Sequence, residues 1–189
     1  MAGRFRTYDC GFPQRLGVPN IHMTLLYPMS ESEFAAYLAF AIPDFAQGKV
    51  KAGQWAVAES LELSRKAYAE SLPQGLATPD NYLFTVRDGA TTEPVGMLWF
   101  AAQERGGQRI AYVYDVSIDM EHQRKGHASR AFAALEVEVQ KRGLSGIALH
   151  VFGQNVGAQA LYQKLGYLPT NINMFKQLTA TTPLTGTPA

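Results

Sequence analysis

One stretch of the sequence has the residue types of an anion-binding loop: Gln123, Arg124, Lys125, Gly126, His127, Ala128 and Ser129. A glycine followed by small side chains lets backbone amides approach an anion closely. The free amides at the start of a helix, together with the positive end of its dipole, favour phosphate. Arg124, Lys125 and Arg130 add full positive charges. Taken alone, the pattern is equally typical of a basic, solvated loop that caps a helix.

A second stretch, residues 155–167, brings a side-chain amide and a phenol into one short helix. Asn155 stands where either a helix N-cap or an amide that binds a substrate is expected. Tyr162 follows about two helical turns later, on nearly the same face. Its hydroxyl can deliver a proton, or it can belong to a core tyrosine whose hydroxyl reaches the surface.

Local sequence signals predict the elements that must position these stretches. Short apolar runs bounded by Gly, Pro or Asp predict strands at Met23–Tyr27, Tyr82–Val86, Val95–Ala101, Arg109–Ile118, Ile147–Phe152, Tyr167–Leu168 and Met174–Leu178. Helical spacing predicts helices that begin after Ser30 and cover Ala52–Leu72, Gly126–Arg142 and Val156–Leu165.

The first two helices carry specific expectations. Ser30 and Glu33 form a capping box, and Pro43 is expected to stop the helix that they start. Residues 43–53 are then expected to form a loop. In the second helix, one face is expected to pack inward: Trp55, Ala58, Leu61, Tyr68 and Leu72.

The order of these elements predicts an α/β fold with a mixed sheet. The connection from the strand at 109–118 through a helix to the strand at 147–152 makes a parallel pair inside an otherwise antiparallel sheet. A ligand cleft is expected where these two strands diverge. Unless a bulge intervenes, Tyr112, Tyr114, Val116 and Ile118 share one face of the strand, and Ala111, Val113, Asp115 and Ser117 share the other.

Composition indicates one globular domain between two irregular ends. The chain has 189 residues, of which 47% are hydrophobic, and a net charge of +1, which argues against a basic nucleic-acid platform. The longest apolar run, Phe34–Ile42, is well short of the roughly 18 residues of a membrane-spanning helix. We therefore expect a flexible leader at 1–22, a working domain at 23–178 and a flexible tail at 179–189, with a cytoplasmic location.

The two stretches together resemble the GNAT family of acyl-CoA-dependent N-acyltransferases. The pyrophosphate loop of that family is matched at Gln123, Gly126 and Ala128. Its second signature is matched at Asn155, Ala158, Leu161, Tyr162, Gly166 and Tyr167. The resemblance implies a GNAT-like sheet, mostly antiparallel, with a central parallel pair splayed around the acyl-CoA and helices on both faces.

The resemblance also implies roles for individual residues. Backbone groups of Val116, Ser117 and Ile118 would bind the pantetheine arm, and an amide near Val116 would hold the oxyanion. Residues 124–129 (Arg124, Lys125, Gly126, His127, Ala128 and Ser129) would cradle the pyrophosphate, with Gln123 opening the loop. Asn155 and Ala158 would contact the arm, and Tyr162 would protonate the departing thiolate.

The sequence does not identify the residue that takes the proton of the acceptor amine. Tyr112 and Tyr114 stand where relatives often place Glu or His, so we expect them to line the acceptor pocket, with a water relay past them. Asp115 is the alternative base, although strand alternation turns it to the other face, where it would serve as a structural hydrogen-bonding group.

The resemblance implies an N-acetyltransferase that uses acetyl-CoA as co-substrate. The alternatives are transfer of another acyl group, or a non-catalytic acyl-CoA-binding module with the same fold. The acceptor is expected to be a small-molecule or peptide amine, and neither nucleic acid nor a membrane is expected as a partner. The sequence leaves open whether the protein forms a homodimer. Since no two of His22, His122, His127 and His150 have metal-ligand spacing, no metal site is expected. His127 is assigned to a variable position of the loop.

Overall fold

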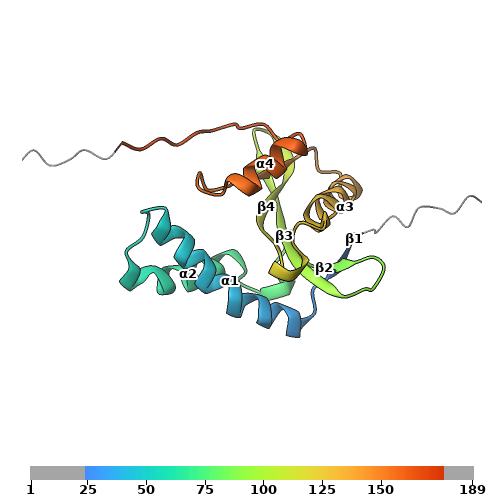
Figure 1. The fold of residues 1–189 in the computed structure, drawn as a ribbon, viewed down its shortest axis with the longest axis horizontal. Helices are drawn as coiled ribbons and strands as arrows, with labels where there is room; N and C mark the ends of the chain where they lie inside the picture. The colour runs from blue at the N-terminus through green and yellow to red at the C-terminus, as the bar shows by residue number, and fades with distance from the viewer. Residues whose placement is uncertain (1–23, 177–189) are drawn as a thin grey trace, which may run out of the picture. The chain divides into compact units, whose positions relative to one another are not determined.

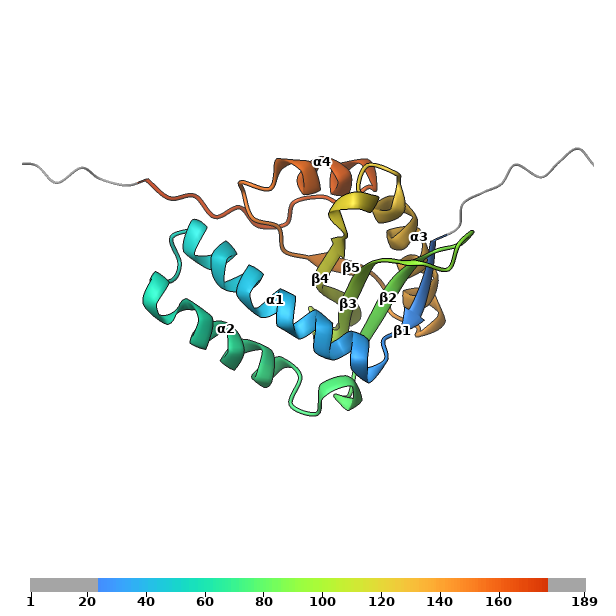
Figure 2. The same cartoon turned by 60° about the horizontal axis from the view of Figure 1, so that its bottom comes forward.

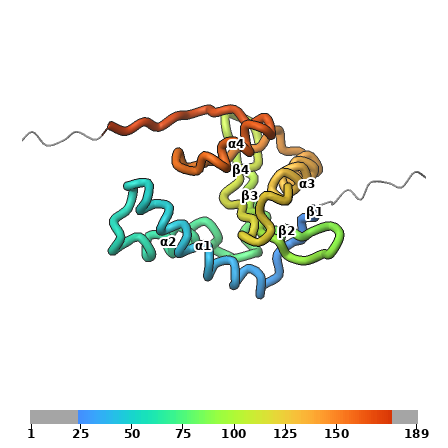
Figure 3. Tube along the Cα trace, viewed as in Figure 1, coloured from blue at the N-terminus to red at the C-terminus, as the bar shows by residue number. Residues whose placement is uncertain are grey.

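The computed structural model describes residues 24–176. The chain forms two compact units, Met1–Phe152 and Gly153–Ala189. The strands are β1 (Thr24–Pro28), β2 (Asn81–Asp88), β3 (Pro94–Arg105), β4 (Gln108–Ile118) and β5 (Ile147–Leu149). The helices are α1 (Glu31–Lys51), α2 (Val57–Ser71), α3 (His127–Lys141) and α4 (Val156–Lys164), with single 3-10 turns at Gly75–Ala77 and Met120–His122. Figures 1 and 3 trace these elements.

The first unit is built on a five-stranded sheet with the order β1-β2-β3-β4-β5. Neighbouring strands are antiparallel except β4 and β5, which are parallel. The mixed sheet predicted from the sequence is therefore confirmed. Among the described residues the parallel pair lies at one end of the strand order, because 167–176 form no strand there. The strand predicted at 167–168 is thus wrong, as is the part of the 174–178 strand that the structure describes; residues 177 and 178 lie outside it, as do the predicted leader and tail.

Helices cover both faces of this sheet, as predicted (Figure 2). On one face, Met97 and Trp99 of β3 join a buried cluster with Phe34, Tyr37 and Ala41 of α1. Alternation turns the neighbouring β3 residues, Leu98 and Phe100, to the opposite face, where α3 contributes the fully buried Phe132 and Leu135. The two faces of β3 therefore belong to two separate apolar layers.

Helix α1 continues through Pro43, so the prediction that this residue ends the helix is wrong. The capping box at its start is confirmed: the Glu33 amide donates to Ser30 Oγ, and the Ser30 amide donates to Glu33 Oε2 at 2.9 Å. Pro43 removes one helical hydrogen bond, but the turns that follow it are held by packing. Ala46 is buried, and Phe45 packs edge-on against Trp55 at 5.5 Å. Residues 43–51 are therefore helix rather than loop.

Helix α2 begins at Val57, five residues after the predicted start, and buries a different face. Ser60 and Ser64 are buried, whereas Ala58 and Leu61 are exposed, Leu61 by 39%. The Ser64 hydroxyl donates to the Ile42 carbonyl of α1 at 2.7 Å. Small serine side chains let α1 and α2 pack closely, which the apolar pattern did not reveal. Of the predicted face, Tyr68 in the helix and Trp55 before its start are half-buried, and Leu72 at its end is buried.

The remaining helices and turns lie close to their predicted bounds. The Gly106 and Gly107 hairpin joins β3 to β4, and Gly143 ends α3 with a φ of 66°. Strand β5 is shorter than predicted and ends at Leu149. Ala131, Leu135 and Val139 form the buried face of α3. Within residues 24–176 no helix has the length and hydropathy needed to cross a membrane.

Candidate active site

Strand β4 carries a β-bulge at Tyr114. Asp115 lies opposite Trp99 and Val113 opposite Phe100, so one extra residue is inserted between two regular stretches of pairing. Directly paired residues share a face of the sheet. Asp115 therefore lies on the face of Trp99, together with Tyr112, and Val116 lies on the other face. The alternation expected from the sequence is wrong beyond Val113, because the bulge restarts it.

The bulge brings Asp115 under helix α1. The Tyr37 hydroxyl donates to Asp115 Oδ2 at 3.0 Å, and the Tyr68 hydroxyl lies 3.4 Å from that of Tyr37. Burial raises the pKa of the Asp115 carboxyl above its usual range, and the nearby charge of Asp44 raises it further. Hydrogen bonds from Tyr37 and from the Val116 amide lower it. The net rise makes this carboxylate a stronger base than an ordinary aspartate.

Aromatic side chains form a continuous surface beside Asp115, which we call the aromatic wall: Phe45, Trp55, Tyr68, Trp99, Tyr112 and Tyr114. Tyr114 stacks on Trp99 with ring centroids 4.5 Å apart and an interplanar angle of 13°. Its ring also meets the edge of Tyr112 at 5.2 Å. The structure thus brings together the two tyrosines that the sequence assigned to the acceptor pocket, and Tyr114 is 44% exposed.

The pairing of β4 with β5 ends several residues before the pairing of β4 with β3. The last pair is Val113 with Leu149, whereas β4 pairs with β3 as far as Ile118. Val116, Ser117 and Ile118, predicted to contact a pantetheine arm, therefore lie on a stretch of β4 that has no β5 partner. On the other edge of this stretch, β3 lies very close to β4 at Gly96. A Cβ at that position would lie 2.1 Å from the Ser117 carbonyl oxygen.

The predicted anion-binding loop follows directly. Gln123 Nε2 donates to the Ile118 carbonyl at 2.9 Å, which ties the loop to the end of β4. Arg124 and Gly126 both have left-handed backbone conformations, with φ of 59° and 81°. Gly126 is the N-cap of α3, and no side chain caps the helix. The first amides of α3, at positions 127–129, therefore meet no capping side chain, which favours an anion.

His127, which the sequence assigned to a variable position of the loop, has a buried side chain that is only 4% exposed. Arg130 Nη2 lies 3.0 Å from its Nδ1, and because a guanidinium only donates, this nitrogen accepts. The proton of the neutral ring is then on Nε2, which lies 3.8 Å from Asp88 Oδ2. Burial and the charge of Arg130 lower the pKa of His127, so the neutral ring is favoured.

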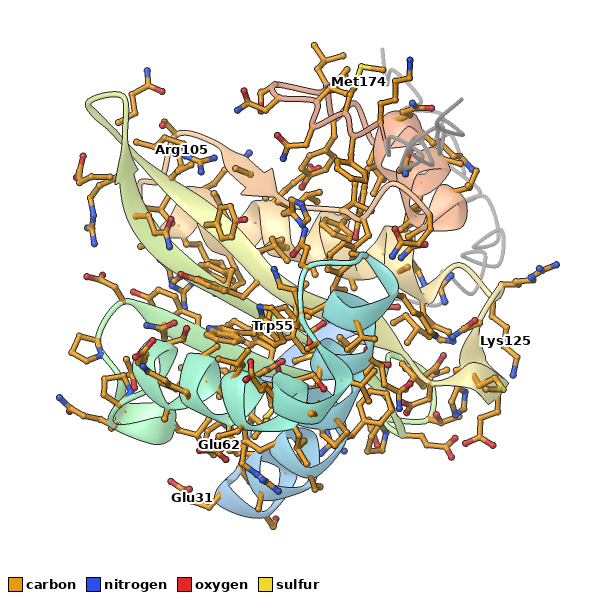
Figure 4. All side chains as sticks on the ribbon, turned by 90° about the vertical axis from the view of Figure 1, so that its left-hand side faces the viewer. Glu31, Trp55, Glu62, Arg105, Lys125 and Met174 are labelled. Carbon is orange, nitrogen blue, oxygen red and sulfur yellow. The ribbon has the colours of Figure 1, made fainter. Side chains whose placement is uncertain are left out.

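Arg130 is an internal brace of the loop. Its Nε donates to Thr24 Oγ1 and its Nη1 to the Lys125 carbonyl, both at 3.0 Å, in addition to the contact with His127. By contrast, Arg124 and Lys125 are exposed, and Lys125 extends outward in Figure 4. The positive charges that remain available to an anion are therefore those of Arg124 and Lys125.

The second unit holds the rest of the predicted site residues. Asn155 is the N-cap of α4, and its Oδ1 accepts from the Ala158 amide at 3.1 Å. Of the two roles expected for Asn155, the structure therefore shows the cap. The ring of Tyr162 packs at 5.8 Å from that of Tyr167, after Gly166 has ended the helix with a φ of 87°.

Comparison with known proteins identifies the family. The profile of the Acetyltransferase (GNAT) family matches residues 49–167. The chain belongs to the GNAT family. It is 34% identical to the uncharacterized N-acetyltransferase YycN of Bacillus subtilis (strain 168), over 82% of this chain and 98% of that protein. YdgE of the same strain, also described as an uncharacterized N-acetyltransferase, is 34% identical over 81% of this chain and 97% of its own length.

Solved GNAT structures share the fold. A crystal structure of YycN aligns with a TM-score of 0.78 and covers 83% of this chain and 99% of the other. The aminoglycoside antibiotic 6'-N-acetyltransferase AAC(6')-Ih from Acinetobacter baumannii is 16% identical, with a TM-score of 0.53, and covers 84% and 99%. At that identity the likeness concerns the fold alone.

The site of this GNAT protein includes residues that the sequence did not reveal. Tyr37 reaches Asp115 across 78 residues of sequence, and Thr24 reaches Arg130 across 106. The ring of Tyr37 is buried, but no local signal in the sequence indicates where its hydroxyl would lie. Among residues 24–176, no group of three or more His, Cys, Asp or Glu side chains is placed to hold a metal ion.

Proposed function

We propose that this GNAT protein transfers the acetyl group of acetyl-CoA to a primary amine, which attacks the thioester directly. The observation that carries the proposal is the edge of β4. From Asp115 to Ile118 it pairs with β3 and not with β5, and Gln123 ties its end to the loop that leads into the uncapped start of α3. A pantetheine arm added along that edge like a strand would leave its pyrophosphate at these amides.

In this proposal the cofactor is bound largely by backbone. Val116, Ser117 and Ile118 offer amides and carbonyls to the arm, and the amides of residues 124–129 hold the pyrophosphate. Arg124 and Lys125 add charge from the solvent side. Arg130 and Gln123 act indirectly, because their side chains hold the loop itself in shape.

We assign the proton of the acceptor amine to Asp115, directly or through a water molecule. The support is its position on the Tyr112 face together with its hydrogen bond from Tyr37. As the amine nitrogen bonds to the thioester carbon, its proton moves to Asp115. The C–S bond then breaks, and the thiolate takes a proton from Tyr162. The Tyr162 role rests on the family signature around it.

The Val116 amide would hold the oxyanion that forms between these steps, an interaction worth about 2.7–4 kcal/mol per donor in other enzymes. This amide also hydrogen-bonds the Asp115 carboxylate and lowers its pKa. Proton transfer to Asp115 weakens that bond, which would leave the amide to the oxyanion as negative charge develops there.

Two measurements test the proposal. Calorimetry should detect CoA binding, and thiol release from acetyl-CoA should accelerate when a primary amine is added. The Tyr162→Phe variant should keep its CoA affinity and lose roughly 10²-fold in kcat, since general acid catalysis typically contributes 10²–10⁴-fold. Tyr27→Phe, on the exposed side of β1, is the matched control and should behave as the unchanged chain.

The same measurements separate the alternatives. CoA binding without amine-dependent thiol release would make the protein an acyl-CoA-binding module. Release that is faster with a longer acyl-CoA than with acetyl-CoA would reassign the acyl group. Absence of CoA binding would refute the proposal.

A further inference from the structure

The aromatic wall already holds cations of the chain itself. The Lys49 ammonium lies 5.2 Å from the ring centroid of Phe45 and 5.6 Å from that of Trp55. At the other end, the Arg105 guanidinium lies 5.3 Å from the ring of Tyr112, near the tip of the β3–β4 hairpin (Figure 4). Both distances are in the range of cation–π attraction. Each end of this surface therefore binds a positively charged side chain.

The middle of the wall has no such cation among the contacts of the described residues. There, one face of Tyr114 is covered by Trp99, while the side chain as a whole is 44% exposed. The exposed part of this ring offers a cationic ligand an electron-rich aromatic surface.

Two carboxylates act on this middle part. Burial raises the pKa of the Tyr68 hydroxyl, and the charges of Asp115 and Asp44 raise it further. Asp115 accepts a hydrogen bond from Tyr37, whereas Asp44 is exposed on α1, directly before Phe45 of the wall, and forms no ion pair with another residue of 24–176. An exposed aromatic ring beside two carboxylates has the composition of a site for an organic cation.

Building on the proposed acetyl transfer, we propose that the acceptor is an alkyl amine that carries a second positive charge. Its reacting nitrogen would lie at Asp115, and its second ammonium would lie against the wall within reach of Asp44. Alkyl diamines and lysine-like side chains that carry an additional charge have this chemistry. Anionic amino acids do not, since their carboxylate would face Asp44 and the aromatic rings.

The test compares three amines of one chain length: 1,5-diaminopentane, pentylamine and 5-aminopentanoate. We expect kcat/KM for acetyl transfer to fall in that order, with the diamine about 10-fold above pentylamine, because one cation–π contact plus one ion pair is worth about 1–2 kcal/mol. The advantage of the diamine should shrink as salt is raised.

Asp44→Asn should reduce the ratio of diamine to pentylamine kcat/KM severalfold, because it removes the ion pair and leaves the cation–π contact. Glu62→Gln is the matched control: it removes one carboxylate from the exposed side of α2, where Glu62 is paired with Arg65, and it should keep the ratio. Equal rates with all three amines, preference for 5-aminopentanoate, or an unchanged ratio in Asp44→Asn would each overturn the inference.

Binding of CoA, measured separately by calorimetry, keeps the two proposals distinguishable. If CoA binds and some amine is acetylated while the diamine has no advantage, the transfer proposal stands and this inference fails. If CoA does not bind, the transfer proposal itself fails.

Discussion

At the scale of single residues, the site depends on side chains that hydrogen-bond one another. Tyr37 donates to Asp115, and Arg130 contacts three partners beneath the loop. Tyr37 and Arg130 do not react themselves: Tyr37 sets the proton affinity of Asp115, and Arg130 sets the geometry of the loop. Variants of these positioning residues should therefore change properties that simple loss of charge or volume would leave alone.

Removal of the Tyr37 hydroxyl should shift the pH dependence of the reaction. Its hydrogen bond lowers the pKa of Asp115, so in Tyr37→Phe that pKa should rise. A base works only when deprotonated, so the acidic limb of the kcat profile should move to higher pH. The measurement is kcat against pH with one amine throughout, so that titration of the amine is common to both proteins.

Tyr27→Phe serves as the control for that profile and should leave the acidic limb in place. Asp115→Asn should abolish this limb together with most of the activity. If the limb of Tyr37→Phe stays where it was or moves to lower pH, Asp115 is not the base.

Arg130 should be required for its shape rather than its charge. Arg130→Lys keeps the positive charge but cannot contact Thr24, His127 and the Lys125 carbonyl at once. We expect CoA affinity to fall about tenfold, since each hydrogen bond contributes about 0.5–1.5 kcal/mol. Calorimetry measures the loss, and Arg65→Lys on the exposed side of α2 is the control. Full affinity in Arg130→Lys would mean that the charge alone matters.

At the scale of elements, local patterns were sufficient where local forces dominate. The capping box at Ser30 and the glycine turns around β3 and β4 are chemical requirements of a few adjacent residues, and the structure confirms them. The prediction that Pro43 ends its helix failed because the forces that decide there are not local. Its cost is local, but the packing of Phe45 on Trp55 and Tyr68, which offsets that cost, comes from the connection after α1 and from α2.

Strands β3 and β4 approach so closely at Gly96 that a side chain cannot be added there. A Cβ would lie 2.1 Å from the Ser117 carbonyl oxygen and 2.9 Å from the Ile118 Cα, both backbone atoms. Gly96→Ala should therefore lower the free energy of unfolding by about 1–3 kcal/mol, the usual cost of overpacking. Urea denaturation measures it.

Gly153→Ala is the comparison for that experiment, because a Cβ at position 153 meets nothing within 4 Å. It should leave the urea midpoint nearly unchanged. Equal midpoints for Gly96→Ala and Gly153→Ala would mean that the two strands can separate at no cost.

At the scale of the whole molecule, the family and its mixed sheet could be predicted, but the face on which the acid lies could not. The two signature stretches identify a GNAT chain because their spacing leaves room for one helix and one strand. The bulge at Tyr114 leaves no local mark, since alternating residues in β4 look regular with or without it. Contacts such as that between Tyr37 and Asp115 arise only when distant segments pack.

The extra residue at position 114 fixes which side of strand β4 carries the acid. If the pairing closed over Tyr114 without loss of a residue, Tyr114 would lie opposite Trp99 and Asp115 opposite Leu98. The carboxylate would then be directed at the layer of Phe132 and Leu135, while Val116 would turn toward helix α1. Deletion of Tyr114 would instead keep Asp115 opposite Trp99, so the loss of one codon there spares the carboxylate, whereas a slip of the pairing by one residue does not.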